Sequence, residues 1–362
     1  MAYELSNSFS VCFNIMKIKY QLYDQSFDEL NVISPTDSIN VFINFESVLS
    51  YLSNIRDLDK KIMTEDEFPI IIISDILNLA AHYRRFFRGN NLDTKVFLYM
   101  TDLTSDSFKE QKINEDYRSY YLTKFNSNPR FSSLTEYLLN EILPEASAII
   151  EFIPNVYLIK TKNVDASVVP LTISKIYPSS KNVIVTGDIF DTQYNFYPNF
   201  AVHYIRKSPL YSSTSWTLKG YLKEIFKKEP DQETEVNLLS NLSFYNTMLS
   251  VIGDRTRSVD PIKRVGVISV IKYLRSGIQS NIIRLDTESI ELIKMCFPED
   301  MREELEQNFR QFSIKEKDES MSESERFAIK EQIIDRFDNN SLLKLNATKF
   351  YHHQLMLTEL TM

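Results

Sequence analysis

Cysteine, glycine and long apolar runs are scarce in this chain of 362 residues, and each scarcity excludes a class of protein. Cys12 and Cys296 are the two cysteines, and their separation suggests neither a disulfide framework nor a zinc site. The longest apolar run, FPIIIISDIL at 68–77, is too short and too interrupted to cross a bilayer. The N-terminus does not resemble a signal peptide. We therefore expect an intracellular protein with no membrane partner.

An overall excess of positive charge is also absent, since the formal net charge is −8. A dedicated nucleic-acid binder is usually basic, so this balance argues against strong non-specific DNA binding. Residues 253–284 are a local exception, because seven basic residues minus two acidic ones leave a balance of +5. The seven are Arg255, Arg257, Lys263, Arg264, Lys272, Arg275 and Arg284. This segment is therefore the candidate surface for a polyanion.

Apolar residues make up 43% of the chain and aromatic residues 12%, which is enough for a substantial core. The abundance of Asn, Ile, Lys, Tyr and Phe suggests an AT-rich genome such as that of a bacteriophage. We therefore expect the protein in the cytoplasm of an infected host cell, with the virion as the alternative location.

Short runs of branched apolar residues alternate with helical patterns along the first part of the chain. The predicted strands are 39–45, 94–100, 155–161, 181–188 and 200–207. Helices are predicted at 46–58, 68–90, 132–146 and 167–177, and over most of the chain from about 217 onward. Strands that alternate with helices are typical of a parallel α/β sheet.

Five short motifs follow one another in an order that resembles the flap endonuclease/5′-nuclease family. VTGDIFDTQY (185–194) resembles the family's VTGDKDFLQL, and NVDASVVPLTIS (163–174) resembles GVEADDVIGTLA. GDRTRSVDPIKRVG (253–266) resembles GDxSDNIPGVxGVG, the core of a helix-three-turn-helix module. FINFES (42–47) and INEDYRSYY (113–121) take the places of the first strand end and of the arch region.

This resemblance implies three parts. Residues 1–38 would be an N-terminal extension, and 39–215 a PIN-like parallel-sheet α/β domain. Residues 216–362 would be a helical region with the helix-three-turn-helix motif and a charged C-terminal segment. Within it, 315–332 is expected to be a solvated linker or an exposed helix. The family's reaction is phosphodiester hydrolysis by two divalent ions, which need several carboxylates around them.

Most of the acids that the resemblance places around those ions are replaced here. The first falls on Asn44, two acids of the EADD motif fall on Ser167 and Val168, and the metal-binding Asp of the helix-three-turn-helix falls on Arg257. Asp165 and Asp188 remain as weak candidate metal ligands. A third acid of the family falls on either Thr101 or Asp102, and Asp102 is the candidate. The second acid of GDKD falls on Phe190, or on Asp191 after a one-residue shift, and Glu46 could compensate. Asp188 alone is equally well explained as a strand-end cap of the following turn.

The DNA-binding motif implied by the resemblance is also altered. Gly253 and Gly266 would stand where the backbone turns tightly and approaches phosphate. Ile268 replaces a lysine of the family, and Pro261 replaces a glycine whose N–H it lacks. The DNA-binding candidates are Arg255, Arg257, Lys263, Arg264, Lys272, Arg84 and Arg85. The basic residues near 253–284 are equally compatible with a solvated surface, and Arg84 and Arg85 with a helix C-terminus.

Three functions remain open. The first is a degenerate phage-type 5′-nuclease that binds branched or duplex DNA or acts as a scaffold in replication or genome processing, with no cofactor. The second is a virion or host-takeover protein that reuses the fold to bind a protein partner. The third is a residual 5′-exonuclease or flap endonuclease that depends on Mg²⁺ or Mn²⁺.

Overall fold

The computed structural model describes residues 38–45, 94–101, 150, 155–162, 164–204, 232–253, 259–263 and 265–338. The predicted extension, the helices at 46–58, 68–90 and 132–146, and the boundary at 215/216 lie outside these residues. None of the helices in the described part combines the length and the apolar character that a bilayer span requires.

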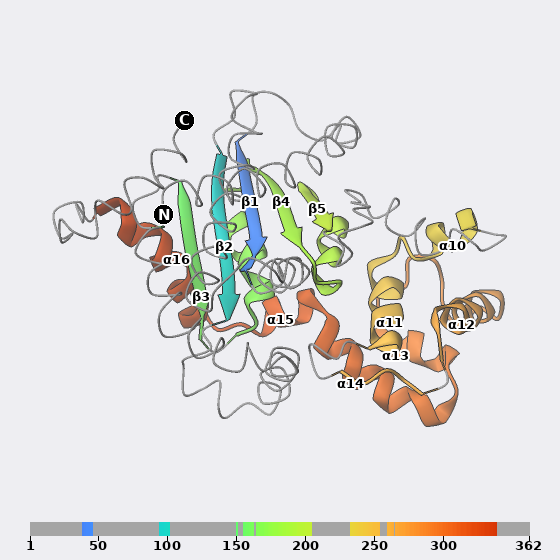
Figure 1. Ribbon diagram of the computed structural model, residues 1–362. Coiled ribbons are helices and arrows are strands. Elements are labelled where there is room, and N and C mark those ends of the chain that lie inside the picture. The colour runs from blue at the N-terminus through green and yellow to red at the C-terminus, as the bar shows by residue number, and fades with distance from the viewer. Residues whose placement is uncertain are drawn as a thin grey trace, which may run out of the picture.

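Five parallel strands form one sheet in the order β3-β2-β1-β4-β5 (Figure 1). The strands are β1 (Ile39–Asn44), β2 (Thr94–Thr101), β3 (Val156–Thr161), β4 (Lys181–Thr186) and β5 (Phe200–Tyr204). All five predicted strands are confirmed, with ends that differ by up to three residues. Every residue of β1 is buried, Asn40 and Asn44 included, which explains why this strand is mainly apolar and does not alternate between apolar and polar residues.

Short helical elements connect the later strands. The 3₁₀ helix η2 (Ala166–Val168) continues into α8 (Val169–Ser174), which confirms the helix predicted at 167–177. Pro170 lies in the first turn of α8, where its missing N–H costs nothing. The 3₁₀ helix η3 (Phe190–Phe196) follows β4 and leads into β5.

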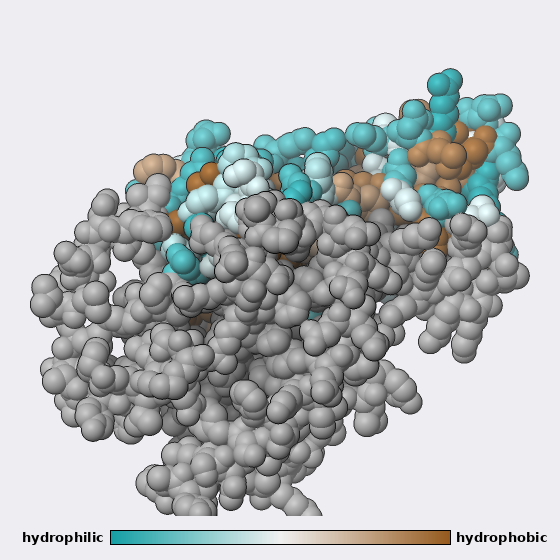
Figure 2. Space-filling view, turned by 90° about the horizontal axis from the view of Figure 1, so that it is seen from above, coloured by the Kyte–Doolittle hydropathy of each residue, from teal (hydrophilic) through white to brown (hydrophobic). Residues whose placement is uncertain are grey.

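A helical region lies beside the β5 edge of the sheet (Figure 1). It contains α10 (Gln232–Leu238), α11 (Leu242–Ile252), α12 (Val267–Gln279), α13 (Ile290–Ile293), η5 (Lys294–Cys296), η6 (Glu299–Met301) and α14 (Arg302–Phe312). One cluster of buried side chains spans both parts, and the Phe190 and Phe312 rings, 6.1 Å apart, join η3 to α14 within it. Seen from above, this end of the molecule shows hydrophobic residues among hydrophilic ones (Figure 2).

The chain returns from the helical region to the sheet through α15 (Ile314–Ser320) and α16 (Glu323–Asp338). The Gln332 amide in α16 accepts a hydrogen bond from Lys160 N at 2.8 Å and donates one to Lys160 O at 2.9 Å. It thereby pairs with the backbone of edge strand β3. Of the two expectations for 315–332, the solvated linker is therefore wrong and the helix is confirmed, although several of its residues are buried rather than exposed. The segment is helical, and Met321 and Ile329 are buried because both helices pack back onto the sheet domain.

Candidate active site at the carboxyl ends of the strands

The sheet has one point at which the strand order reverses. From β1 the chain moves outward through β2 and β3, and then returns to the opposite side of β1 to form β4. In open parallel sheets, ligands bind beyond the carboxyl ends of the strands at such a switch point. Asn44, which ends β1, and the segment after Thr186, which ends β4, flank this place.

Asp191 connects the ends of three strands from within the protein. It lies in η3 and is fully buried. Its Oδ2 atom accepts hydrogen bonds from Asn44 Nδ2 at 2.8 Å, from Tyr99 Oη at 2.9 Å and from Thr186 Oγ1 at 2.7 Å. These donors come from β1, β2 and β4. The carboxylate therefore holds the strand ends in place through neutral hydrogen-bond donors.

The Tyr99 hydroxyl stays protonated next to this carboxylate. Burial raises the pKa of Tyr99 well above its ordinary value, and the negative charge of Asp191 raises it further. A protonated phenol can donate to Asp191, whereas a phenolate could not. The hydrogen bond to Asp191 is therefore maintained across the neutral pH range.

Asp188 caps the turn after β4. Its backbone N–H donates to Thr186 Oγ1 at 2.9 Å, and its Oδ1 atom accepts from the backbone N–H of Phe190 at 2.8 Å. This is the Asx-type turn that a strand-end aspartate commonly makes. Because Thr186 also donates to Asp191, one threonine orders both acids of the 185–194 motif.

Asp165 is paired with a lysine. It is the N-cap of η2 and accepts from Ser167 N at 2.9 Å, while its Oδ2 atom lies 2.6 Å from Lys317 Nζ. The Lys317 ammonium also lies 4.6 Å from the centre of the Phe190 ring. Phe190, at the position where the resemblance places the second acid of GDKD, thus presents its ring face to the Lys317 ammonium.

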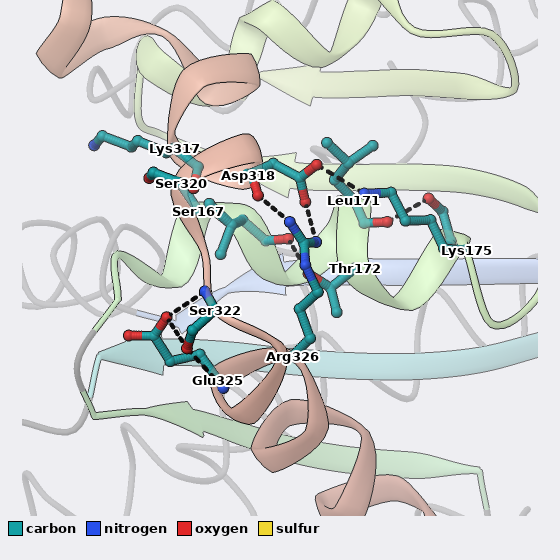
Figure 3. Close-up of polar contacts among 12 residues, drawn as sticks. Ser167, Leu171, Thr172, Lys175, Lys317, Asp318, Ser320, Ser322, Glu325 and Arg326 are labelled. Carbon is teal, nitrogen blue, oxygen red and sulfur yellow. Dashed lines mark hydrogen bonds and ion pairs between the residues drawn. The ribbon is translucent and has the colours of Figure 1, made fainter.

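Neighbouring contacts fix α15, and with it Lys317. Asp318 is buried and binds Lys175 Nζ at 2.7 Å and Arg326 Nη1 at 2.8 Å, and its backbone carbonyl also accepts from Arg326 Nη2. Figure 3 shows these contacts joining α15 to α8 and α16, with Lys317 leaving α15 in another direction. The Gln193 amide donates to Phe312 O at 2.6 Å, just before α15 begins. These contacts fix the position of α15, and the position of α15 places the Lys317 side chain beside Asp165.

The described residues contain no group of three or more His, Cys, Asp or Glu side chains that could hold a metal ion. Asp165, Asp188 and Asp191 are each engaged as above, and Glu46, Asp102 and Arg257 lie outside the described part. In the described part of the site, Asn44 and Ser167 are neutral side chains at positions where the resemblance places acids, and Asp165, Asp188 and Asp191 do not form a metal-binding group. Sequence reasoning missed Lys317, Tyr99 and Thr186.

The two glycines of 251–266 have different roles. Gly253 has a φ of +64°, and a Cβ there would lie 2.5 Å from Pro261 N and 2.6 Å from Val259 O. The fold itself therefore requires this glycine. Gly266 is the exposed N-cap of α12, and a Cβ there would meet no atom within 4 Å.

Of the seven DNA-binding candidates, the structure places two. Lys263 and Lys272 are exposed, on the turn before α12 and on α12 itself. Ile268, where the family has a lysine, is partly buried against the core, and Pro261 is exposed. Arg84, Arg85, Arg255, Arg257 and Arg264 lie outside the described residues.

The parallel sheet with its flanking helices and C-terminal helical region is the PIN-like α/β fold of flap nucleases. Among solved structures, the bacteriophage T5 flap endonuclease, as a pseudo-enzyme–product complex with DNA and metal ions, superposes with a TM-score of 0.51 at 11% identity. That match covers 83% of this chain and 100% of the T5 chain. The T5 5′-exonuclease with bound zinc gives a TM-score of 0.51 at 11% identity, over 83% and 98% of the two chains.

A third structure, a T5 protein co-crystallized with metal ions, gives a TM-score of 0.51 at 12% identity, over 83% of this chain and 98% of that one. At such identities the likeness concerns the fold. No family model and no curated protein sequence matches the chain.

Proposed function

We propose that this chain is a pseudo-nuclease: a PIN-fold relative of phage 5′-nucleases that has lost two-ion catalysis and binds DNA through its helical region. It would act as a non-catalytic DNA-binding or scaffolding protein in replication or genome processing. The observation that carries the proposal is the ion pair between Lys317 and Asp165, with Nζ and Oδ2 2.6 Å apart.

The charges at the strand ends support the loss of catalysis. Two divalent ions bring four positive charges, and several carboxylates have to offset their dehydration. Here Asn44 and Ser167 contribute no charge, and Lys317 adds a positive one beside Asp165. At about 4 Å from an ammonium, a unit positive charge is repelled by about 4 kcal/mol at an effective dielectric constant near 20, and a divalent ion by about twice that.

The surface around α12 supports DNA binding. Lys263 and Lys272 are exposed, and the open space at Gly266 lets a phosphate approach the start of the helix. The T5 flap endonuclease, which shares the fold, has been solved with DNA. That complex with DNA, and the flap endonuclease activity that the T5 protein is named for, are the basis for expecting a branched or flapped duplex as the ligand.

The test is fluorescence anisotropy with a labelled 5′-flap DNA in EDTA, so that binding is measured without metal. We expect binding that weakens as salt rises. The double variant Lys263→Glu/Lys272→Glu should weaken binding at least about tenfold and reduce the salt slope by about two, since each phosphate contact contributes about one unit. The matched variant Lys315→Glu/Lys330→Glu carries the same charge change on α15 and α16 and should bind nearly as the unmodified protein does.

If both double variants lost DNA affinity equally, the loss would be due to the change in net charge alone, which would contradict a specific DNA-binding surface around α12. No measurable affinity at moderate salt would favour the virion or host-takeover function, in which the fold binds protein. Cleavage of the flap when Mg²⁺ or Mn²⁺ is added would favour a residual nuclease.

A further inference from the structure

Exposed apolar side chains are concentrated in one short part of the helical region. Among the described residues, four of the five large hydrophobic side chains that are exposed lie between 282 and 295. They are Ile282 (42% exposed), Leu285 (64%), Leu292 (50%) and Met295 (46%). Single exposed apolar residues are ordinary on a protein surface, whereas a cluster indicates an interaction site.

Gly277 in α12 brings the two ends of this segment together. Its carbonyl accepts a hydrogen bond from Ile282 N at 2.9 Å, and a Cβ at Gly277 would lie 2.2 Å from Cys296 Sγ. The backbone at Ile282 and the side chain that follows Met295 thus contact the same turn of α12. Leu292 is three residues before Met295 in consecutive helical turns, so the two share a face.

The loop that presents Leu285 is held by hydrogen bonds on both sides. Asn241 Nδ2 donates to Leu285 O at 3.0 Å, and Ser243 Oγ donates to Glu288 O at 3.0 Å. Within the loop, Arg284 N donates to Thr287 Oγ1 at 2.8 Å. The Leu285 side chain is therefore exposed on an ordered backbone, which lowers the entropy lost when a partner binds.

The surroundings of these apolar residues are acidic. Residues 282–300 contain five acidic and two basic residues, and five minus two leaves a net charge of −3. Lys294, one of the two bases, is ion-paired with Glu291 and with Glu306, whose Oε2 lies 2.5 Å from its Nζ. Asp286 and Glu288 are exposed, and the contact of Glu288 with the exposed Lys315 ammonium, at 3.5 Å, is long and open to solvent. This charge repels DNA and attracts a positively charged protein segment.

We propose that Ile282, Leu285, Leu292 and Met295, with Asp286 and Glu288, form a docking surface for a basic amphipathic helix of a partner protein. Apolar side chains of that helix would contact the four exposed residues, and its lysines or arginines would face the carboxylates. The surface follows the C-terminal end of α12, whereas Gly266 caps its N-terminal end. The 13 residues of α12 separate the two places by about 20 Å, so DNA and the partner could be bound together.

The probe is a fluorescein-labelled 18-residue peptide with leucines at i, i+3, i+4 and i+7 and lysines at the remaining positions, added to the full chain. A peptide of the same composition in scrambled order is the control. We expect the amphipathic peptide to bind at least tenfold more tightly than the scrambled one. Leu285→Ser/Leu292→Ser should reduce this affinity at least tenfold, and Asp286→Lys/Glu288→Lys should reduce both the affinity and its salt dependence. Phe327→Ser, an exposed apolar residue on α16, should leave it unchanged.

Equal affinity for the two peptides, or unchanged binding in Leu285→Ser/Leu292→Ser, would overturn the proposal. Self-association abolished by that variant, without peptide binding, would assign the surface to a second copy of the chain and overturn it as well. The flap-DNA measurement with Lys263 and Lys272 variants is independent, so failure here leaves the DNA result unchanged.

Discussion

Lys317 Nζ lies 2.6 Å from Asp165 Oδ2, although 152 positions separate the two residues in the sequence. The pair joins α15 to the turn that begins η2, at the carboxyl end of the sheet. The negative charge of Asp165 is therefore matched by a cation that belongs to the chain.

A double-mutant cycle of Lys317→Met and Asp165→Asn measures this pair. We expect a coupling free energy of about 1 kcal/mol, since both side chains are mostly buried yet reached by solvent. The measurement is urea unfolding of the four proteins. The control cycle Lys315→Met with Glu288→Gln joins exposed side chains 3.5 Å apart and should give a coupling near zero. A coupling no larger than in the control would show that the Lys317 pair does not hold α15.

Substitution of Asp191 tests whether its carboxylate is structural or a metal ligand, because the two roles predict opposite changes in the free energy of unfolding. In a cluster of metal-binding acids, removing one carboxylate from the metal-free protein relieves repulsion and stabilises it. Here Asp191→Ala would leave the donors of Asn44, Tyr99 and Thr186 without their acceptor. We expect a loss of about 3 kcal/mol in the free energy of unfolding, measured with urea in EDTA. An increase in stability would contradict the structural role.

The two glycines of 251–266 should respond differently to alanine. Gly253→Ala forces a side chain into a positive φ and against the backbone at Val259 and Pro261, and should cost about 2 kcal/mol or more. Gly266→Ala adds its methyl group to open space and should cost less than about 1 kcal/mol, while weakening flap-DNA binding. Thermal unfolding and anisotropy measure the two effects. Equal stability losses, or DNA affinity unchanged in Gly266→Ala, would count against this assignment.

The raised pKa of Tyr197 predicts that the protein loses stability at alkaline pH. Burial raises the pKa of Tyr197 from 10.0 to about 12, and the charges of Asp318 and Glu319 contribute. The folded chain then keeps a proton that the unfolded chain releases, so this contribution is complete below pH 10 and declines as the pH rises toward 12. Between pH 9 and pH 11, the free energy of unfolding of Tyr197→Phe should fall by about 1 kcal/mol less than that of the unmodified protein. Urea unfolding at both pH values is the measurement, and equal losses would contradict the shift.

The strands were predictable because local sequence determines them. Each is a short and largely apolar run, and β1 is buried enough on both faces that no alternation was needed to recognise it. The turn at Asp188 was also foreseeable, since a strand-end aspartate commonly bonds the backbone two residues on. The order of the motifs then suggested the PIN-like fold that the structural likeness shows.

The contacts that define the candidate site were not predictable, because they join distant segments. Lys317 lies in a charged stretch that was expected to be solvated, and its partner is known only once α15 is placed. The apolar residues Ile314, Met321 and Ile329, which are buried in the structure, were the available sequence signal that this stretch packs onto the fold. Asp191 could be proposed as a ligand by a one-residue shift, whereas its contacts with Tyr99 and Asn44 required the register of three strands.

A cleavage assay with a labelled 5′-flap DNA in Mn²⁺ tests the loss of two-ion catalysis most directly, with the T5 flap endonuclease as the positive control. The account predicts no product above the metal-free background, for the unmodified protein and for Asp188→Ala alike. Mn²⁺-dependent cleavage by the unmodified protein that disappears in Asp188→Ala would contradict it.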